Sequence, residues 1–409
     1  MVDLGHNPWR KDFPSLTQTM HGKPLVYLDS GASAQKPLVV IESIRKAYEE
    51  KYANIHRGLY EFSQVKTEEF EWARSKVARF IGASSSREIV FTRNSTEAIN
   101  LVAQTWGRNF LKTGDEIILS VMEHHANLVP WFLLRDQIGV VLKFIPVLED
   151  GTLDMDFFQK ALSSRTRMVS LVHVSNVLGT INNSFEISKI TKEFNPEIKV
   201  LFDGSQAVVH GFVNVQDFAP DFYVFTGHKL YGPTGVGVLY GKYDVLASMP
   251  PYQGGGDMIE KVTLEGAVYA EPPSRFEAGT PAIAEVIGLG AAVDYLMSVG
   301  MDKVRAWEEN LHLYAREELM EIEGLKIYGH QPEKAAIISF TLEGCPAGDV
   351  AMILDQMGIA VRTGHHCCMP LMQHLGVDGT VRASMGMYSD RSDIDSLVFG
   401  LEKACNILR

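Results

Sequence analysis

The stretch FYVFTGHKLYGPTGVG, residues 222–237, decides the fold of this chain. Its first four residues are aromatic or β-branched, which is typical of a buried strand. The chain then breaks at Gly227 and turns again through Gly232 and Gly235. Lys229 therefore comes just after a buried strand and is surrounded by glycine-rich turns. Most lysines are solvated surface charges, so a lysine in this position needs an explanation.

Two explanations of Lys229 differ in what surrounds its amine. A lysine at the rim of the sheet would simply mark the surface. An amine that is removed from water loses its proton more readily and can condense with an aldehyde. The aldehyde cofactor pyridoxal phosphate would also need an anion beside its ring nitrogen and a group that binds its phosphate.

Two further strand ends supply candidates for these roles. The apolar run KVLF, residues 199–202, leads into Asp203. An acid in such a position caps a helix or contacts a ligand, because an unpaired buried charge is costly. The run EIVFT, residues 88–92, leads into RNST, residues 93–96, and then into a helix. Hydroxyls and free N–H groups at a helix start can bind phosphate. Alone this would be an ordinary helix cap, but with Asp203 and Lys229 it favours the cofactor.

Apolar β runs alternate with helical stretches from about residue 88 to residue 241. Such alternation is typical of a mostly parallel sheet covered by helices, and these sheets bind ligands at the carboxyl ends of their strands. We therefore predict an α/β fold with a mostly parallel, seven-stranded sheet. Its strands are expected at residues 88–92, 116–121, 141–147, 168–174, 199–202, 222–225 and 236–241.

Three regions of the chain differ in pattern. Residues 1–22 are polar and mixed, and we predict an N-terminal arm that packs on the smaller domain. Residues 23–297 are assigned to a large cofactor-binding domain, with helices expected near 38–52, 65–80 and 283–297. Residues 298–409 begin with a long helix and continue as strand, strand, helix, strand, loop, strand and helix. This order predicts a smaller α+β domain that carries the loop RTGHHC.

Composition restricts the class of protein. The hydrophobic content of 46% is ordinary for a globular chain, and no apolar run approaches the roughly 18 residues that span a bilayer. The net charge of −12 disfavours nucleic acid and anionic membranes as partners. Four cysteines are too few for a disulfide framework, and no targeting signal is visible at the start, so we expect a cytoplasmic protein.

Paired histidines and paired cysteines lie together in RTGHHCCM, residues 362–369. They could bind a metal ion, but strictly adjacent ligands cannot easily point at one ion, and structural zinc sites space their cysteines more widely. The preferred interpretation is a nucleophilic thiol on a flexible loop, where nearby cations favour the thiolate. We therefore expect no metal.

Five stretches in the same order carry a resemblance to a known family. They are HVSNVLGT (173–180), DGSQA (203–207), TGHKLYGPTG (226–235), RFEAGTP (275–281) and RTGHHC (362–367). The chain resembles cysteine desulfurases of the SufS type, which belong to the class V, fold-type-I branch of pyridoxal-phosphate enzymes. The resemblance runs from about Phe13 to the C-terminus.

The resemblance implies an activity and partners. The enzyme would convert L-cysteine to L-alanine and keep the sulfur as a persulfide on Cys367. It would be a homodimer, and a SufE-like or SufU-like acceptor protein would take the sulfur for iron–sulfur cluster assembly. Selenocysteine lyase activity is a further expectation.

The resemblance also assigns roles to single residues. Lys229 would hold pyridoxal 5'-phosphate and move the Cα proton, Asp203 would keep the ring nitrogen protonated, and His124 would stack on the ring. By the same resemblance, Gln206 and Asn176 contact the ring oxygen and the substrate side; Ser95, Thr96, Thr226 and His228 bind the phosphate; Thr280 comes from the neighbouring protomer; and Arg382, with Arg362 as a second candidate, binds the substrate carboxylate.

Other functions remain open. A selenocysteine lyase, another class V lyase or a transaminase would share Lys229 and Asp203, although transamination needs no thiol at Cys367. A scaffold that has lost its cofactor would keep the fold, but the presence of all three residues argues against it. The chain departs from the family pattern at Cys368, where a small alanine is typical.

Overall fold

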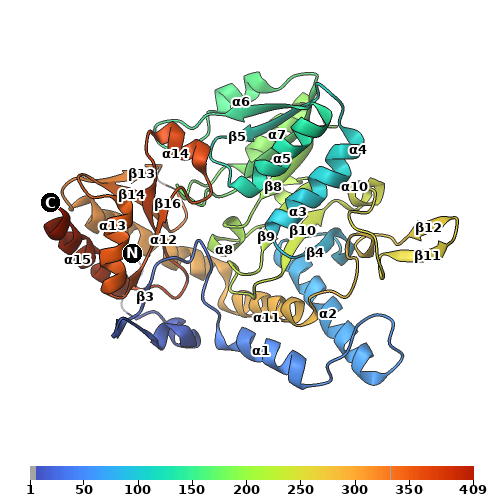
Figure 1. Ribbon diagram of the computed structural model, residues 1–409, viewed down its shortest axis with the longest axis horizontal. Coiled ribbons are helices and arrows are strands. Elements are labelled where there is room, and N and C mark those ends of the chain that lie inside the picture. Colours follow the sequence, from blue (N-terminus) through green and yellow to red (C-terminus); the bar gives the residue numbers. More distant parts are fainter. Residues whose placement is uncertain (1–5, 332) are drawn as a thin grey trace.

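The computed structural model describes residues 6–331 and 333–409. The first five residues of the predicted arm and Pro332 lie outside the described residues. A large α/β part and a smaller α+β part lie side by side, and the C-terminus belongs to the smaller part (Figure 1).

The large part is built on one seven-stranded sheet with the strand order β4-β10-β9-β8-β7-β5-β6. Within it β10 runs antiparallel to both neighbours, and the other pairs are parallel. The predicted α/β fold with a mostly parallel seven-stranded sheet is confirmed. The strands are β4 (Ile89–Thr92), β5 (Glu116–Ser120), β6 (Val141–Ile145), β7 (Thr166–Val172), β8 (Lys199–Asp203), β9 (Phe222–Thr226) and β10 (Gly237–Gly241).

Both faces of this sheet are buried under helices. Along β9, Phe222 and Val224 pack into one apolar cluster, together with residues of α3 and α5. Tyr223 and Phe225 point to the other face, into a cluster that includes residues of α2, α7 and α11. A strand that is buried on both faces reads as a continuous apolar run, as residues 222–225 do. These helices are α2 (Glu61–Phe80), α3 (Ser95–Val102), α5 (Val129–Ile138), α7 (Ser184–Phe194) and α11 (Ile283–Val299).

Some helix limits differ from the prediction. The predicted helix at 38–52 is α1 (Leu38–Glu49), and α2 begins at Glu61 rather than near residue 65. The first turn of α2 is mostly polar, so it lacks the apolar period that marks the rest of the helix. Sequence reasoning also missed α14 (Met369–Leu375), a short helix with a proline in its first turn. The remaining α-helices of the large part are α4 (Arg108–Phe110), α6 (Met155–Ala161), α8 (Ala207–His210), α9 (Val215–Phe218) and α10 (Tyr243–Ser248).

The smaller part has its own sheet and its own apolar core. The sheet order is β13-β14-β17-β16. Helices α12 and α13 contact this sheet, and α15 packs on both helices. The short strand β3 (Val26–Tyr27) pairs in parallel with β15, so this early segment adds to the smaller part. The predicted domain limits at residues 22 and 297 stay predictions. The elements are α12 (Met301–Met320), β13 (Leu325–Tyr328), β14 (Ile337–Leu342), α13 (Ala347–Gln356), β15 (Ile359–Ala360), β16 (Arg362–Gly364), β17 (Thr380–Ser384) and α15 (Arg391–Leu408).

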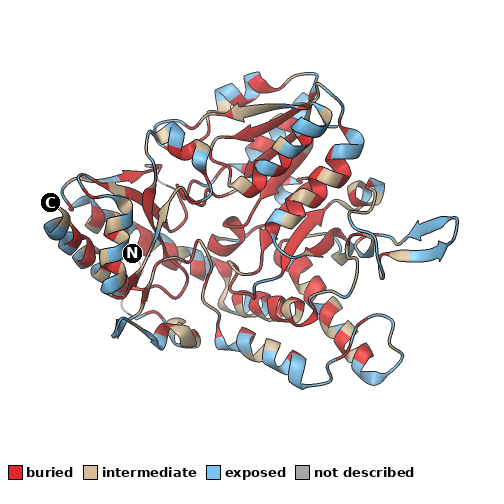
Figure 2. Ribbon diagram, in the orientation of Figure 1, coloured by how far each residue is buried: buried red, intermediate tan, exposed pale blue. Residues whose placement is uncertain are grey.

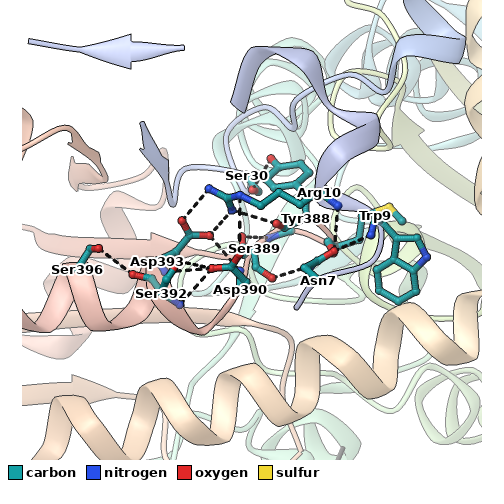
Figure 3. A network of polar contacts seen from close by, with 12 residues as sticks. Asn7, Trp9, Arg10, Ser30, Tyr388, Ser389, Asp390, Ser392, Asp393 and Ser396 are labelled. Carbon is teal, nitrogen blue, oxygen red and sulfur yellow. Dashed lines mark hydrogen bonds and ion pairs between the residues drawn. The ribbon is translucent and has the colours of Figure 1, made fainter. Parts of the chain in front are cut away.

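The described part of the predicted arm lies against the start of α15 (Figure 3). The Asn7 side-chain amide donates to the backbone oxygens of Met387 and Ser389. The Arg10 guanidinium forms an ion pair with Asp393 at 2.6 Å. These contacts tie the first described residues to a segment near the end of the chain.

A two-stranded hairpin, β11 (Ile259–Thr263) and β12 (Gly266–Tyr269), projects from the large part at the right of the view (Figure 1). It is exposed along almost its whole length (Figure 2). Apolar side chains such as Val262, Leu264 and Val268 are accessible to solvent there. An exposed apolar hairpin is typical of a contact surface.

Among the described residues, no single helix is long and apolar enough to cross a membrane. Helices α11 and α12 meet that test of length and composition only as a pair, and the pair is bent by 76°.

Candidate active site

A cavity of about 210 Å³ opens at the carboxyl edge of the large sheet. Strands β4, β5, β7, β8 and β9 lead into the segments that line one side of it, and β16 and β17 of the smaller part supply the other. Every predicted site residue except Thr280 lies on its wall. These residues are Ser95, Thr96, His124, Asn176, Asp203, Gln206, Thr226, His228, Lys229, Arg362, Cys367 and Arg382.

Lys229 follows β9 by three residues and reaches into this cavity. Burial lowers the pKa of its amine, the Asp203 carboxylate opposes that change, and the Arg382 guanidinium adds to it. A neutral amine has the free electron pair that condensation with an aldehyde requires. The environment of Lys229 therefore matches the chemistry predicted for it.

Asp203 is the last residue of β8 and is buried. Its Oδ1 accepts from the Ser205 backbone N–H at 3.0 Å and from the Ser205 hydroxyl at 2.6 Å. In the described part of the chain no hydrogen bond reaches Oδ2. That oxygen is free to accept a hydrogen bond from a bound group. The next residue must be Gly204, because a Cβ there would lie 2.1 Å from the Tyr223 hydroxyl.

The start of α3 forms the end of the cavity where a phosphate can bind. The Asn94 side chain accepts from the Glu97 N–H at 2.9 Å and caps this eight-residue helix. The Ser95 hydroxyl is 2.8 Å from the hydroxyl of Ser205. The Thr226 hydroxyl is buried without a hydrogen-bond partner. A helix N-terminus beside an unpartnered hydroxyl is suited to bind an anion.

His124 lies between β5 and α5 and presents a neutral ring to the cavity. Burial, together with the positive charge of Lys229, lowers its pKa to about 3. Its Nδ1 accepts from the Ala126 N–H at 3.1 Å, so the ring proton is on Nε2. A neutral imidazole can stack on an aromatic ring without bringing a charge into the cavity.

Two arginines from adjacent strands face one carboxylate that sequence reasoning missed. Arg382 on β17 and Arg362 on β16 are register partners, and both donate to Asp29. The Arg382 side chain is buried, which lowers its pKa, and it also donates to the Asn176 backbone oxygen at 2.9 Å. Its Nε is buried without a partner. The unsatisfied donor of Arg382 is suited to a substrate carboxylate.

The two adjacent cysteines lie in opposite environments. Cys367 is exposed and has a left-handed backbone with φ of 56°. Cys368 is fully buried, and its thiol donates to Asn176 Oδ1 at 3.2 Å. Burial raises the pKa of the Cys368 thiol, which keeps it protonated. Cys367 alone of the two is accessible from the cavity.

Histidines that the sequence analysis did not assign hold this loop in place. The His125 backbone N–H donates to the Cys367 oxygen at 2.7 Å, and the His125 ring Nε2 accepts from the Met369 N–H at 3.1 Å. His366 also lines the cavity, and burial lowers its pKa to about 3. The only hint of this contact in the sequence was the pair of adjacent histidines at 124 and 125. Their partners could not be predicted, because they lie about 240 residues away.

Thr280 is not brought together with the other predicted residues. It lines a separate cavity with Arg93, Gly235 and Tyr252, and residues of α3 also line that cavity. Thr280 therefore does not line the cavity that contains Lys229 in its own chain.

The chain matches known proteins over nearly its whole length. The family model described as aminotransferase class-V matches residues 26–397. The chain belongs to this family. A cysteine desulfurase of Dickeya dadantii is 50% identical over 98% of this chain and 96% of its own length. A cysteine desulfurase of Serratia proteamaculans is 48% identical over 98% of both chains.

Two solved structures of cysteine desulfurases are also similar to this chain. The crystal structure of the cysteine desulfurase CsdA from Escherichia coli has a TM-score of 0.91 and is 38% identical, over 98% of both chains. The apo structure of a cysteine desulfurase from Thermococcus onnurineus has a TM-score of 0.92 and is also 38% identical over 98% of both chains. The predicted fold-type-I architecture is confirmed.

As a class-V family member the chain is an enzyme, and its cofactor is pyridoxal phosphate. The residues of the cavity fit this cofactor. Lys229 offers an amine, Asp203 a free carboxylate oxygen and His124 a neutral ring, and the buried Thr226 hydroxyl lacks a partner that a phosphate would supply. The cofactor that was predicted from the sequence is therefore confirmed, while the roles of the single residues stay predictions.

Proposed function

We propose that this enzyme is a cysteine desulfurase of the SufS type, which converts L-cysteine to L-alanine and holds the sulfur as a persulfide on Cys367. One observation carries the proposal: an accessible thiol lies on the wall of the cavity that also contains Lys229 and Asp203. A transaminase would need no such thiol. The cysteine desulfurases that are about half identical to this chain support the same activity.

Substrate binding would depend on the arginine pair. Arg382 has a buried Nε without a partner and can donate to a carboxylate. Asp29 already neutralises part of the positive charge of Arg382 and Arg362. The positive charge that remains would attract the substrate carboxylate, and a charge-assisted hydrogen bond would orient it.

Proton transfer would depend on Lys229. Pyridoxal phosphate, when bound, supplies an electron sink for the carbon from which a proton is removed. A lysine whose pKa is lowered by burial can take the substrate Cα proton and later return a proton to carbon. Asp203, through the oxygen that protein donors leave free, would hold the proton of the ring nitrogen.

Sulfur transfer would depend on Cys367. Its thiolate attacks the sulfur of the substrate, the carbon–sulfur bond breaks, and a sulfur–sulfur bond forms on the enzyme. The substrate carbon gains protons and leaves as alanine, so the reaction is L-cysteine plus thiol to L-alanine plus persulfide. Cys368 cannot replace Cys367, because its buried thiol is protonated and hydrogen-bonded to Asn176.

The persulfide would leave through an acceptor protein. The loop RTGHHC is short and is hydrogen-bonded to His125 and Asn176, so Cys367 is held beside the cavity. A SufE-like or SufU-like partner would reach in and carry the sulfur to iron–sulfur cluster assembly. Selenocysteine lyase activity would use the same residues. The four cysteines are free, which is consistent with the cytoplasm as the location.

A homodimer would complete the site. Thr280 lies outside the cavity of its own chain, at the base of the segment that carries the exposed hairpin β11–β12. A second copy could place this threonine at the phosphate end of the neighbouring cavity. The exposed apolar side chains of the hairpin support such a contact.

The decisive experiment combines turnover with covalent mapping. The purified enzyme should form alanine from L-cysteine, and borohydride reduction should fix the pyridoxyl group on Lys229. Lys229→Ala should retain less cofactor and form no alanine, whereas the exposed Lys189→Ala should behave as wild type. Transamination products in place of alanine and persulfide would overturn the proposal.

A further inference from the structure

We propose that His125, His365 and Cys367 form a zinc-binding site at the mouth of the cavity, and that a bound ion reversibly blocks Cys367. One possible ligand atom of each residue lies within 4.8 Å of the other two. No metal was predicted from the sequence, because strictly adjacent residues of RTGHHCCM cannot easily point at one ion. His125, however, belongs to a different segment, which the fold brings to this loop.

The backbone of the loop turns two of these side chains to the same side. His366 and Cys367 both have left-handed backbones, with φ of 51° and 56°. The Cys367 N–H donates to Nδ1 of His365 at 3.0 Å, which closes a tight turn. Residues 365 and 367 therefore face one point, while Cys368 is directed into the core.

His125 completes the set from the opposite side. Its backbone N–H donates to the Cys367 oxygen at 2.7 Å. This hydrogen bond fixes the position of the His125 segment relative to the cysteine loop. The rings of His125 and His365 have centroids 5.6 Å apart and an angle of 31° between their planes. Small side-chain rotations would bring both imidazoles and the thiol to the spacing of a common ion.

The ligand chemistry selects the metal. Two imidazoles and one thiolate form the kind of three-ligand set that binds Zn²⁺ and leaves a fourth position for water. Each ring accepts a backbone N–H through one nitrogen, so that nitrogen carries an electron pair that a metal ion could use instead. A zinc ion would replace one ordinary hydrogen bond on each ring. Mg²⁺ and Ca²⁺ prefer oxygen ligands and would not compete.

The consequence rests on the proposed role of Cys367 as the nucleophile. Zinc binding releases the thiol proton and places the sulfur electron pair on the metal. That electron pair can then no longer attack the sulfur of a substrate. A chelator removes the ion and restores the thiol, so the site would act as a reversible stop on persulfide formation.

Zinc binding to the holoenzyme tests the site directly. Calorimetric titration with Zn²⁺ should show one ion per chain, and Mg²⁺ should show none. X-ray absorption at the zinc edge should find one sulfur at about 2.3 Å and two nitrogens at about 2.0–2.1 Å. Because loss of even an outer-shell partner costs about 10- to 100-fold in affinity, His365→Ala and His125→Ala should each weaken binding at least tenfold.

The control is Cys405→Ser, on helix α15, which should bind zinc as wild type does. If His125→Ala fails to fold, the partly exposed His365→Ala decides the question alone. A zinc site with two sulfurs would indicate Cys345 and Cys405 instead, whose thiols contact each other, and would overturn the proposal, as would an absence of stoichiometric binding. An enzyme that forms alanine but binds no zinc refutes this site only. An enzyme that binds zinc at these residues but forms no alanine even after a chelator has removed the ion refutes the proposed function only.

Discussion

At the scale of single residues, the chemistry depends on how two neighbouring thiols are placed. Cys367 is exposed beside the cavity, and Cys368 is buried with its thiol on Asn176. Alternation along the chain predicts that two adjacent side chains diverge, but it does not say which of them meets the cavity. The left-handed backbone of Cys367 and the pocket around Cys368 make that choice.

We expect Cys367→Ser to keep the bound cofactor but to lose alanine and persulfide formation. Cys368→Ala should remain active and should lose only about 1 kcal/mol of stability, because the cavity it leaves is small. Alanine release and protein mass should be measured over the first turnovers, before thiol exchange can move sulfur between the two positions. Activity in Cys367→Ser together with an inactive Cys368→Ala would reverse the assignment.

At the scale of elements, the phosphate end of the cavity depends on a close approach between β10 and the start of α3. A Cβ on Gly237 would lie 2.5 Å from the Cα of Asn94, the residue that caps the helix. The obstacle is backbone, so it cannot rotate away. The position of the helix N-terminus is therefore tied to a glycine on a neighbouring strand.

Gly237→Ala should push α3 away from the cavity. We expect a loss of about 1–3 kcal/mol in the free energy of unfolding and a measurable loss of bound cofactor. Urea unfolding and cofactor absorbance measure the two effects. Gly254→Ala is the matched control, because no atom lies within 4 Å of a Cβ there; equal behaviour of the two variants would contradict the argument.

At the scale of the whole molecule, contacts between distant parts of the chain hold the smaller part together. Arg10 pairs with Asp393, whose side chain is nearly inaccessible (Figure 3). Burial raises the pKa of Asp393 to about 6, although Arg10 opposes this. A carboxyl whose pKa is raised by folding costs stability as pH rises from about 4 through about 6, because the folded state must then bury its charge.

Arg10→Ala should therefore be harmful mainly above pH 6. We expect roughly 2 kcal/mol of lost stability near pH 8, because a buried charge loses a partly exposed partner, and almost none below pH 4. Thermal or urea unfolding across this range measures the difference. The double variant Arg10→Ala, Asp393→Asn should lose the pH dependence, and a difference that stays constant from pH 4 to pH 8 would refute the assignment.

The predicted homodimer is also a property of the whole molecule. Because Thr280 lies outside the cavity of its own chain, dilution to monomers should weaken cofactor binding and lower activity. Sedimentation and activity measured over the same concentration range test this. Thr280→Ala should reproduce the loss of cofactor without dissociating the dimer. A fully active monomer would show that one chain suffices.

The sequence by itself determined the large sheet and most of the site. The strands coincide with the apolar β runs of the sequence, and each run is terminated by glycines or polar residues. Both features could be predicted because strand formation and turn chemistry are local properties. Lys229, Asp203 and Ser95 follow three of those strands, and parallel strands bring their carboxyl ends to one edge. Nine of the twelve predicted residues on the cavity wall come from this edge, whereas Arg362, Cys367 and Arg382 come from the smaller part.

Only the tertiary structure decided which distant groups meet. Asp29 between the two arginines, His125 beside the cysteine loop, and Arg10 on Asp393 each join segments more than 200 residues apart. No local pattern encodes such pairs, because they depend on how the smaller part packs against the large sheet. The direction of each cysteine was decided in the same way, since it follows from the space and the hydrogen-bond partners that packing leaves around the loop.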